Sequence, residues 1–209
     1  MNKELLLISA LIAISGLQVS AQTTPYFQQT VDHNIHVQLN DVDHELDAEI
    51  WTQYVNNSPD ELDYLWYHVW PNAYSSAKSA LAKQQFREGD LFMFYAMARD
   101  LGGMDGLDFK INGEAARWEF HNAHPDIVKV YLNTPLQPGG SIEINTPFHV
   151  RIPSGKISRL GHIGQSYQIT QWYPKPAVYD RDGWHEMPYL DQGEFYSEFG
   201  TFDVHITLP

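Results

Sequence analysis

The stretch IVKVYLNTPLQPGGSIEINTPFHVRI, residues 127–152, decides the fold class. Residues 127–132 and 141–152 are rich in β-branched and apolar side chains, as strands are. Pro138-Gly139-Gly140 between them favours a turn. We therefore expect two successive strands here and an all-β protein.

Further strand runs extend in both directions from this stretch. Asn112-Gly113, between two of them, suits the positive φ angles of a tight hairpin turn. One helical pattern follows Ser75-Ser76, which favour a helix start, and ends at Glu88-Gly89. Strands spaced by roughly 10 residues with turns between them predict a saddle-like β-sandwich of mostly antiparallel strands with one short helix. The additional strand runs are 35–39, 49–55, 64–70, 107–111, 115–120, 167–173 and 202–208.

The amino terminus has the organisation of a secretory signal peptide. Lys3 precedes an apolar run from Leu5 to Leu17, and Val19-Ser20-Ala21 supplies the small residues that a signal peptidase requires. A membrane-spanning helix needs roughly 20 apolar residues, and this run is shorter. We therefore expect a signal peptide over residues 1–21, an exported protein (periplasmic or extracellular), and one mature domain over residues 22–209.

Composition narrows the classes of partner. The formal net charge of the chain is −13, which argues against binding to nucleic acid or to anionic membrane surfaces. No cysteine is present, so thiolate catalysis and Cys-ligated zinc are excluded.

The 6 Trp, 12 Tyr and 10 Phe residues are sufficient for a large core, which argues against disorder. The same aromatic side chains would also suit a carbohydrate-stacking surface.

No catalytic motif is complete in this chain. His185-Glu186 begins like a zinc-peptidase helix, but the second histidine is absent and Pro188 would break the helix. His33 and His36 would point to opposite faces of a strand. Acidic residues between positions 180 and 198 would serve a two-carboxylate glycosidase, but the glycines among them favour solvated loops. We expect no catalytic residue and no metal ligand here.

Two segments resemble a known enzyme family. Residues 64–74, YLWYHVWPNAY, are similar to a segment of a bacterial branch of the aminopeptidase N-like (gluzincin) zinc metallopeptidases. Residues 171–180, QWYPKPAVYD, resemble a second segment of that branch, which continues through Gly183-Trp184 and Tyr189-Leu190. The similarity ends in residues 193–204, GEFYSEFGTFDV, followed by the isoleucine and proline of the same pattern.

The resemblance implies a role within a larger enzyme. In that family a saddle-shaped amino-terminal β domain leans against a catalytic domain, which carries zinc on an H-E-x-x-H motif that this chain lacks. The chain would then be the non-catalytic amino-terminal domain of an exported zinc metallo-aminopeptidase and would wall the cleft for peptide substrates. Its partner would be the catalytic domain of the same polypeptide, beyond residue 209, and the zinc would lie in that domain. The alternative is a free-standing β-sandwich that binds a protein or a glycan.

The resemblance also implies candidate substrate-binding residues. In many relatives a Gln or Glu, shortly before the proline of the W-Y-P segment, reaches the free amine of the substrate. An amide oxygen there accepts a hydrogen bond from an ammonium group. Gln165 is the nearest counterpart, with Gln168 and Gln171 as competitors. If residues 167–173 form a regular strand, Gln168 and Gln171 face opposite sides of it.

Overall fold

The computed structural model describes residues 26–193 and 195–209, so the expected signal peptide, residues 1–21, lies outside the described residues. The strands of the larger sheet are β1 (Thr30–Asn40), β2 (Glu45–Val55), β4 (Gly103–Asp105), β5 (Lys110–Ile111), β6 (Glu114–Ala115), β9 (Ser141–Arg151) and β15 (Phe202–Thr207). Those of the smaller sheet are β3 (Leu62–His68), β7 (Trp118–Phe120), β8 (Ile127–Leu136) and β12 (Lys175–Pro176). Two hairpins consist of β10 (Gly161–Ile163) with β11 (Ser166–Gln168), and β13 (Tyr179–Asp180) with β14 (Gly183–Trp184). The helices are α2 (Ala80–Arg87) and α3 (Phe92–Tyr95), with 3-10 turns η1 (Trp70–Tyr74) and η2 (Ala98–Asp100).

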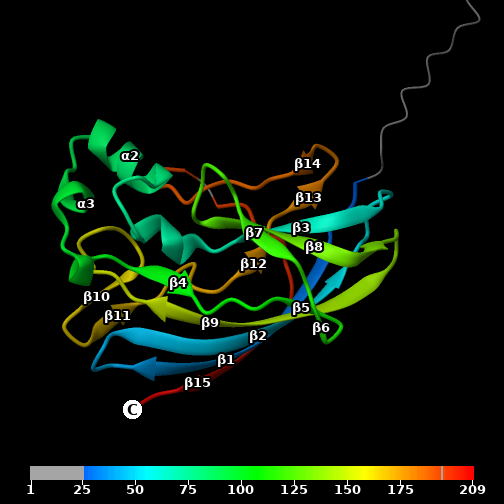
Figure 1. Cartoon of the computed structure of the whole chain (residues 1–209), viewed down its shortest axis with the longest axis horizontal. Coiled ribbons are helices and arrows are strands. Elements are labelled where there is room, and N and C mark those ends of the chain that lie inside the picture. Colours follow the sequence, from blue (N-terminus) through cyan, green and yellow to red (C-terminus); the bar gives the residue numbers. More distant parts are fainter. Residues whose placement is uncertain (1–25, 194) are drawn as a thin grey trace, which may run out of the picture.

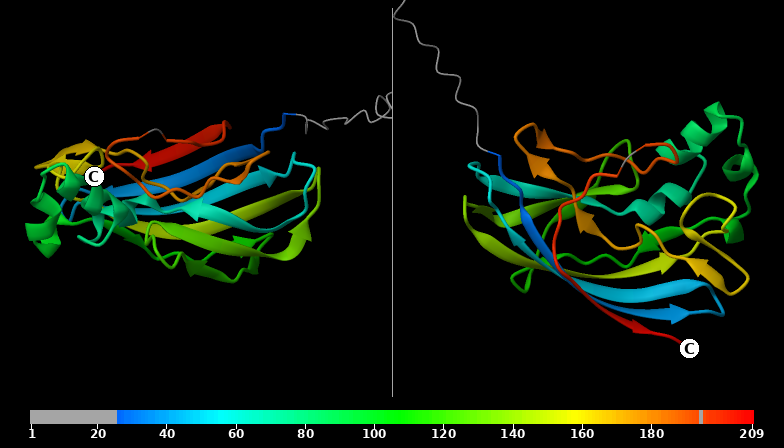
Figure 2. Two further views of the ribbon diagram at one scale, coloured as in Figure 1. Left: turned by 90° about the horizontal axis from the view of Figure 1, so that it is seen from above. Right: turned by 180° about the vertical axis from the view of Figure 1, so that it is seen from behind.

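The two main sheets have different strand orders. The larger sheet runs β15-β1-β2-β9-β5-β6, with β4 also paired to β9, and the smaller runs β12-β3-β8-β7 (Figure 1). Pairings between named strands in the described part are antiparallel, except that β1 and β15 are parallel. In Figure 2 the red β15 lies beside the blue β1 at the edge of the larger sheet.

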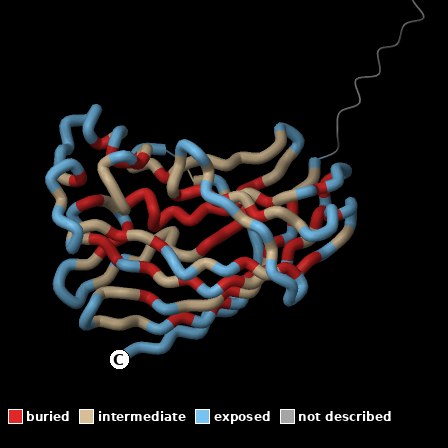
Figure 3. The backbone as a smooth tube through the Cα atoms, viewed as in Figure 1, coloured by how far each residue is buried: buried red, intermediate tan, exposed pale blue. Residues whose placement is uncertain are grey.

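One core joins the two sheets. Val31, Ile35 and Val37 alternate along β1 and share a buried cluster with Leu65 and Val128 of the smaller sheet. Alternation directs every second side chain of a strand to one face, so the inner rows of both sheets meet there. Figure 3 shows these buried segments between exposed edges. The prediction of an all-β, sandwich-like domain of mostly antiparallel strands is confirmed.

The two strands of the opening stretch are confirmed as β8 and β9, but they belong to different sheets. The turn at Pro138-Gly139-Gly140 therefore carries the chain from one layer of the sandwich to the other. The predicted hairpin at Asn112-Gly113 is also present, with φ angles of 51° and 84°. Its second arm is shorter than expected, because β6 ends at Ala115 and β7 starts again at Trp118 in the smaller sheet.

The helical region begins later than the sequence predicts. The side chain of Ser79 accepts a hydrogen bond from the backbone nitrogen of Ala82, so Ser79 rather than Ser75-Ser76 is the cap of α2. The one-turn helix α3 follows it. Both helices lie at one end of the molecule in Figure 1. In the described part of the chain no helix has the length and apolar character needed to cross a membrane.

Candidate functional site

An apolar groove of about 630 Å³ lies between β1, β2, the segment that follows β11, and β15. Successive inward positions of β1, Val37 and Leu39, contribute to its lining, and Asp41 continues the same two-residue spacing into the next turn. The polar side chains of the lining are those of Asp41, Gln165 and Tyr167. The groove therefore combines a mostly apolar wall with a small polar group. Its other lining residues are Leu46, Ile169, Trp172, Ile206, Leu208 and Pro209.

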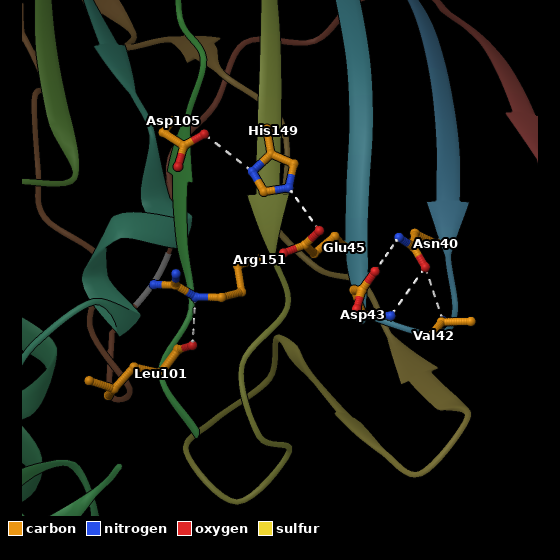
Figure 4. Close-up of polar contacts among 8 residues, drawn as sticks. All are labelled: Asn40, Val42, Asp43, Glu45, Leu101, Asp105, His149 and Arg151. Carbon is orange, nitrogen blue, oxygen red and sulfur yellow. Dashed lines mark hydrogen bonds and ion pairs between the residues drawn. The ribbon is translucent and has the colours of Figure 1, made fainter. Parts of the chain in front are cut away.

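The β1–β2 turn that carries Asp41 is held by Asn40. The Oδ1 atom of Asn40 accepts hydrogen bonds from the backbone nitrogens of Val42 at 3.0 Å and Asp43 at 3.1 Å. Its Nδ2 donates to Asp43 Oδ2 at 2.9 Å (Figure 4). His44 completes the turn with a φ of 60°, a conformation that non-glycine residues adopt infrequently. The turn therefore fixes the backbone of Asp41.

The β10–β11 hairpin carries Gln165 at its tip, next to Gly164, whose φ is 56°. Its base is packed tightly. A Cβ atom added at Gly161 would lie 2.5 Å from the Cα of Gly155, so only glycine allows this approach of the two backbones. The backbone nitrogen of Gly155 also donates to the carbonyl oxygen of His162 at 2.9 Å. The base of the hairpin is therefore anchored to the body of the domain.

Side chains join the hairpin to the β1–β2 turn. The Tyr167 hydroxyl lies 2.7 Å from His44 Nδ1 and donates to the carbonyl oxygen of Asp41 at 3.3 Å. The rings of His44 and His162 stack with 3.6 Å between their centroids. Gln165 Nε2 donates to Asp41 Oδ2 at 3.2 Å. Burial, with a contribution from the Asp41 carboxylate, raises the pKa of Tyr167, so this hydroxyl keeps its proton at neutral pH.

The structure separates the three candidate glutamines. Gln165 lines the groove, whereas the exposed Gln168 lines a neighbouring hollow of about 370 Å³. Gln171 turns inward, and its Oε1 accepts a hydrogen bond from Lys175 Nζ. The expectation of a strand over residues 167–173, with Gln168 and Gln171 on opposite faces, is wrong: β11 ends at Gln168 and Gln171 has a φ of 52°. The left-handed backbone at Gln171 accompanies the inward turn that gives the buried ammonium an acceptor.

Lys175 is a buried basic side chain. In the described part of the chain it forms no ion pair with an acidic side chain. Its ammonium also donates to Ser197 Oγ at 2.9 Å and lies 4.1 Å from the centroid of the Trp70 ring. Burial lowers the pKa of Lys175 to about 7. Burial and the charge of Lys175 lower the pKa of His33 to about 4 and that of His68 to about 3. Both histidines are therefore neutral at neutral pH.

The described residues do not offer a metal centre: no three histidine or carboxylate side chains among them lie close enough to share an ion. His185, from the incomplete peptidase motif, contacts Asp180 Oδ1 at 2.8 Å. His149 lies between Glu45 at 3.4 Å and Asp105 at 3.2 Å on the outer face of the larger sheet (Figure 4). The zinc that the resemblance implies is expected in the catalytic domain rather than here.

β15 carries apolar side chains that the rest of the described chain leaves exposed to solvent. Phe202, Val204 and Ile206 are 50%, 40% and 64% exposed. Their neighbours in register on β1 are His33, Ile35 and Val37, which form the buried inner row. The apolar inner surface of the larger sheet therefore continues onto β15 beyond the part that the smaller sheet covers.

No family model matches the chain, and no curated protein matches it. Solved structures similar to it include M1 zinc metallopeptidases. A two-domain M1 zinc metallopeptidase mutant bound to L-arginine is 14% identical, with a TM-score of 0.45 over 87% of this chain and 33% of that chain. The M1 zinc metallopeptidase from Deinococcus radiodurans is 13% identical, with a TM-score of 0.37 over 60% and 21%. Yeast LTA4 hydrolase in complex with bestatin is 10% identical, with a TM-score of 0.33 over 67% and 18%.

The chain thus spans a third or less of the length of these proteins. Of the candidate residues that the resemblance implies, Gln165 lines the groove. Sequence reasoning did not single out Asp41 and Tyr167, which also line it, or His44, which contacts Tyr167. Asn40-Asp41 is a turn signal, but turn chemistry does not reveal which distant hairpin packs against the turn.

Proposed function

We propose that this chain is the non-catalytic amino-terminal domain of an exported zinc metallo-aminopeptidase, and that it walls the cleft in which peptide substrates bind. One observation carries the proposal: the groove of about 630 Å³ brings residues of the peptidase-like stretches next to Gln165, the candidate contact for the substrate amine. Trp172 comes from the stretch 171–180, and Ile206 and Pro209 are the isoleucine and proline that follow residues 193–204.

The proposed partner is the catalytic domain of the same polypeptide. Phe199 is 84% exposed, and the apolar face of β15 follows it directly in the chain. Contiguous exposed apolar surface commonly marks an interaction site. A catalytic domain packed on this surface would remove it from water and would supply the zinc ligands and the general base.

The proposed substrate is a peptide with a free amino terminus. An ammonium group pairs well with an amide oxygen or a carboxylate, and the groove contains both, on Gln165 and Asp41. Gln171 is less suited to this role, because its amide oxygen already accepts from Lys175. Gln168 faces a different hollow. We therefore assign the substrate contact to Gln165.

The test compares this chain with the product of the complete reading frame, both without residues 1–21. We expect the longer protein to bind one equivalent of zinc and to hydrolyse an aminoacyl reporter, and the present chain to do neither. Zinc at one equivalent in the present chain after dialysis, or turnover above the blank, would contradict the non-catalytic assignment. A reading frame without H-E-x-x-H would instead support the free-standing binding module.

A further inference from the structure

We propose that Asp41 is a positioning residue, which orients the side-chain amide of Gln165 so that its oxygen is presented to the substrate ammonium. The inference rests on the proposed function and adds a residue to it. Its basis is the hydrogen bond from Gln165 Nε2 to Asp41 Oδ2, at 3.2 Å, on the lining of the groove.

The chemistry of the two side chains determines the orientation of the amide. A glutamine amide has a donor end and an acceptor end, and a half-turn about its last torsion exchanges them. An ionised carboxylate only accepts hydrogen bonds. Beside Asp41, the amide nitrogen of Gln165 is therefore favoured at the contact, and the amide oxygen is repelled from it. The oxygen is left on the far side of the amide, where it can accept a hydrogen bond from a cation.

Both partners of this contact are held by rigid elements. Asp41 lies in the turn that Asn40 organises, and its carbonyl oxygen accepts from the Tyr167 hydroxyl. Gln165 lies at the tip of a hairpin whose base is anchored at Gly155 and Gly161. A side chain that is already held in place loses little conformational freedom when the ligand binds. Its contact with the ligand is therefore stronger than that of a mobile side chain.

Two stacked histidines form another contact between the hairpin and the turn. His44 contributes a ring from the turn and His162 contributes one from the hairpin, with 3.6 Å between the centroids. His44 Nδ1 also lies 2.7 Å from the Tyr167 hydroxyl, which donates to the carbonyl oxygen of Asp41. This contact joins the same two elements. The Asp41–Gln165 hydrogen bond is a further contact between turn and hairpin, and both of its side chains line the groove.

A direct test of the orientation uses the present chain in solution. Gln165 side-chain amide signals, assigned by their loss in Gln165→Ala, are compared in nitrogen-15 spectra of the parent and two variants. Asp41→Asn should move these signals toward the position of a solvated amide. Asp47→Asn removes the same charge from an exposed position of the same β1–β2 hairpin and should leave them unchanged. Unaltered Gln165 amide signals in Asp41→Asn would overturn the proposal.

A double-mutant cycle in the full-length enzyme tests whether Asp41 acts through Gln165. We expect Asp41→Asn to lower kcat/KM for a free-amine reporter by about 3- to 10-fold, the size of one ordinary hydrogen bond. In the Gln165→Ala background the same change should have no further effect, because the amide that Asp41 orients is gone. Additive losses would overturn the positioning role and would assign the effect to the charge of Asp41 alone. Asp47→Asn again serves as the control.

The two experiments separate this inference from the proposed function. If the full-length protein hydrolyses the reporter but the cycle is additive, the role of Asp41 fails and the proposed function stands. If the protein has no aminopeptidase activity, the proposed function and the substrate half of this inference both fail. The spectra of the present chain then still decide whether Asp41 orients Gln165.

Discussion

The ammonium group of Lys175 lies 4.1 Å from the centroid of the Trp70 ring, inside the domain. A cation over the face of an indole is attracted by the negative charge density of the ring. The contact ties β12 to η1, and the hydrogen bond from Lys175 to Ser197 Oγ extends the connection to the segment before β15. Burial outweighs these contacts and lowers the pKa of Lys175 to about 7, so the burial of this group makes stability depend on pH.

Lys175 should make the free energy of unfolding rise with pH. Its folded-state pKa of about 7 lies below the ordinary value of 10.5, so the unfolded chain binds more protons between these limits. The free energy of unfolding therefore increases with pH in this range, by at most about 1.4 kcal/mol per pH unit. Denaturant titrations at about pH 7 and about pH 9, inside that window, should show a smaller rise for Lys175→Met than for the parent. Exposed Lys156→Met should keep the parent's rise, and equal rises in all three proteins would refute the assignment.

Gly200→Ala should release β15 from the sheet. A Cβ atom at this position would lie 1.7 Å from the carbonyl oxygen of Val31, so the chain would have to move away from β1. We expect a loss of about 1–3 kcal/mol, typical of overpacking, together with loss of amide-exchange protection at His33, whose nitrogen donates to Thr201.

The control for this variant is Gly89→Ala. Gly89 has a φ of 93° and open space around the added Cβ, so the substitution introduces backbone strain without a clash. It should lower stability by roughly 1 kcal/mol and leave the protection of His33 intact. Native protection of His33 in Gly200→Ala would show that β15 accommodates the methyl group.

The contact between Asp32 and Thr201 should weaken in acid. Asp32 Oδ1 accepts from the backbone nitrogen and from the hydroxyl of Thr201, at 2.8 Å each, and these bonds lower the pKa of Asp32 below 3.8. A lowered carboxyl pKa stabilises the folded state above the ordinary value, and this contribution is lost as the pH falls through the folded-state pKa. The amide signal of Thr201 should therefore titrate with a midpoint below 3.8. In Asp32→Asn that titration should be absent; a midpoint above 3.8 in the parent would refute the assignment.

Gln165→Ala and Gln171→Ala should have different effects in the proposed full-length aminopeptidase. Loss of a hydrogen bond to the substrate ammonium, worth roughly 1.5–3 kcal/mol, should lower kcat/KM of Gln165→Ala by about 10- to 150-fold. The thermal midpoint should barely change, because the Gln165 side chain is exposed.

Gln171→Ala should instead lower the thermal midpoint, since it removes an acceptor from the buried ammonium of Lys175. Thermal midpoints and kcat/KM measured on both variants separate the two roles. Unchanged activity in Gln165→Ala would remove this residue from the site, and equal losses of activity and stability would make it structural.

Sequence alone determined the features that depend on local chemistry. Alternating apolar residues such as Ile35 and Val37 specify a strand and its buried face, because the backbone directs successive side chains to opposite sides. Turn residues such as Asn112-Gly113 specify a reversal, because they adopt positive φ at low cost. These local preferences were sufficient for the fold class and for most of the long strands. They did not assign β8 and β9 to separate sheets, because the partner of a strand lies elsewhere in the chain.

Only the tertiary structure decided which side chains form the candidate site. Gln168 and Gln171 belong to one expected strand in the sequence, but β11 ends at Gln168, and Gln171 turns inward and accepts a hydrogen bond from Lys175. Asp41 and Gln165 are 124 positions apart, and their contact depends on how a hairpin packs on a turn. Such contacts follow from the packing of the whole domain rather than from residue preference, so the orientation of Gln165 becomes visible only once the chain is folded.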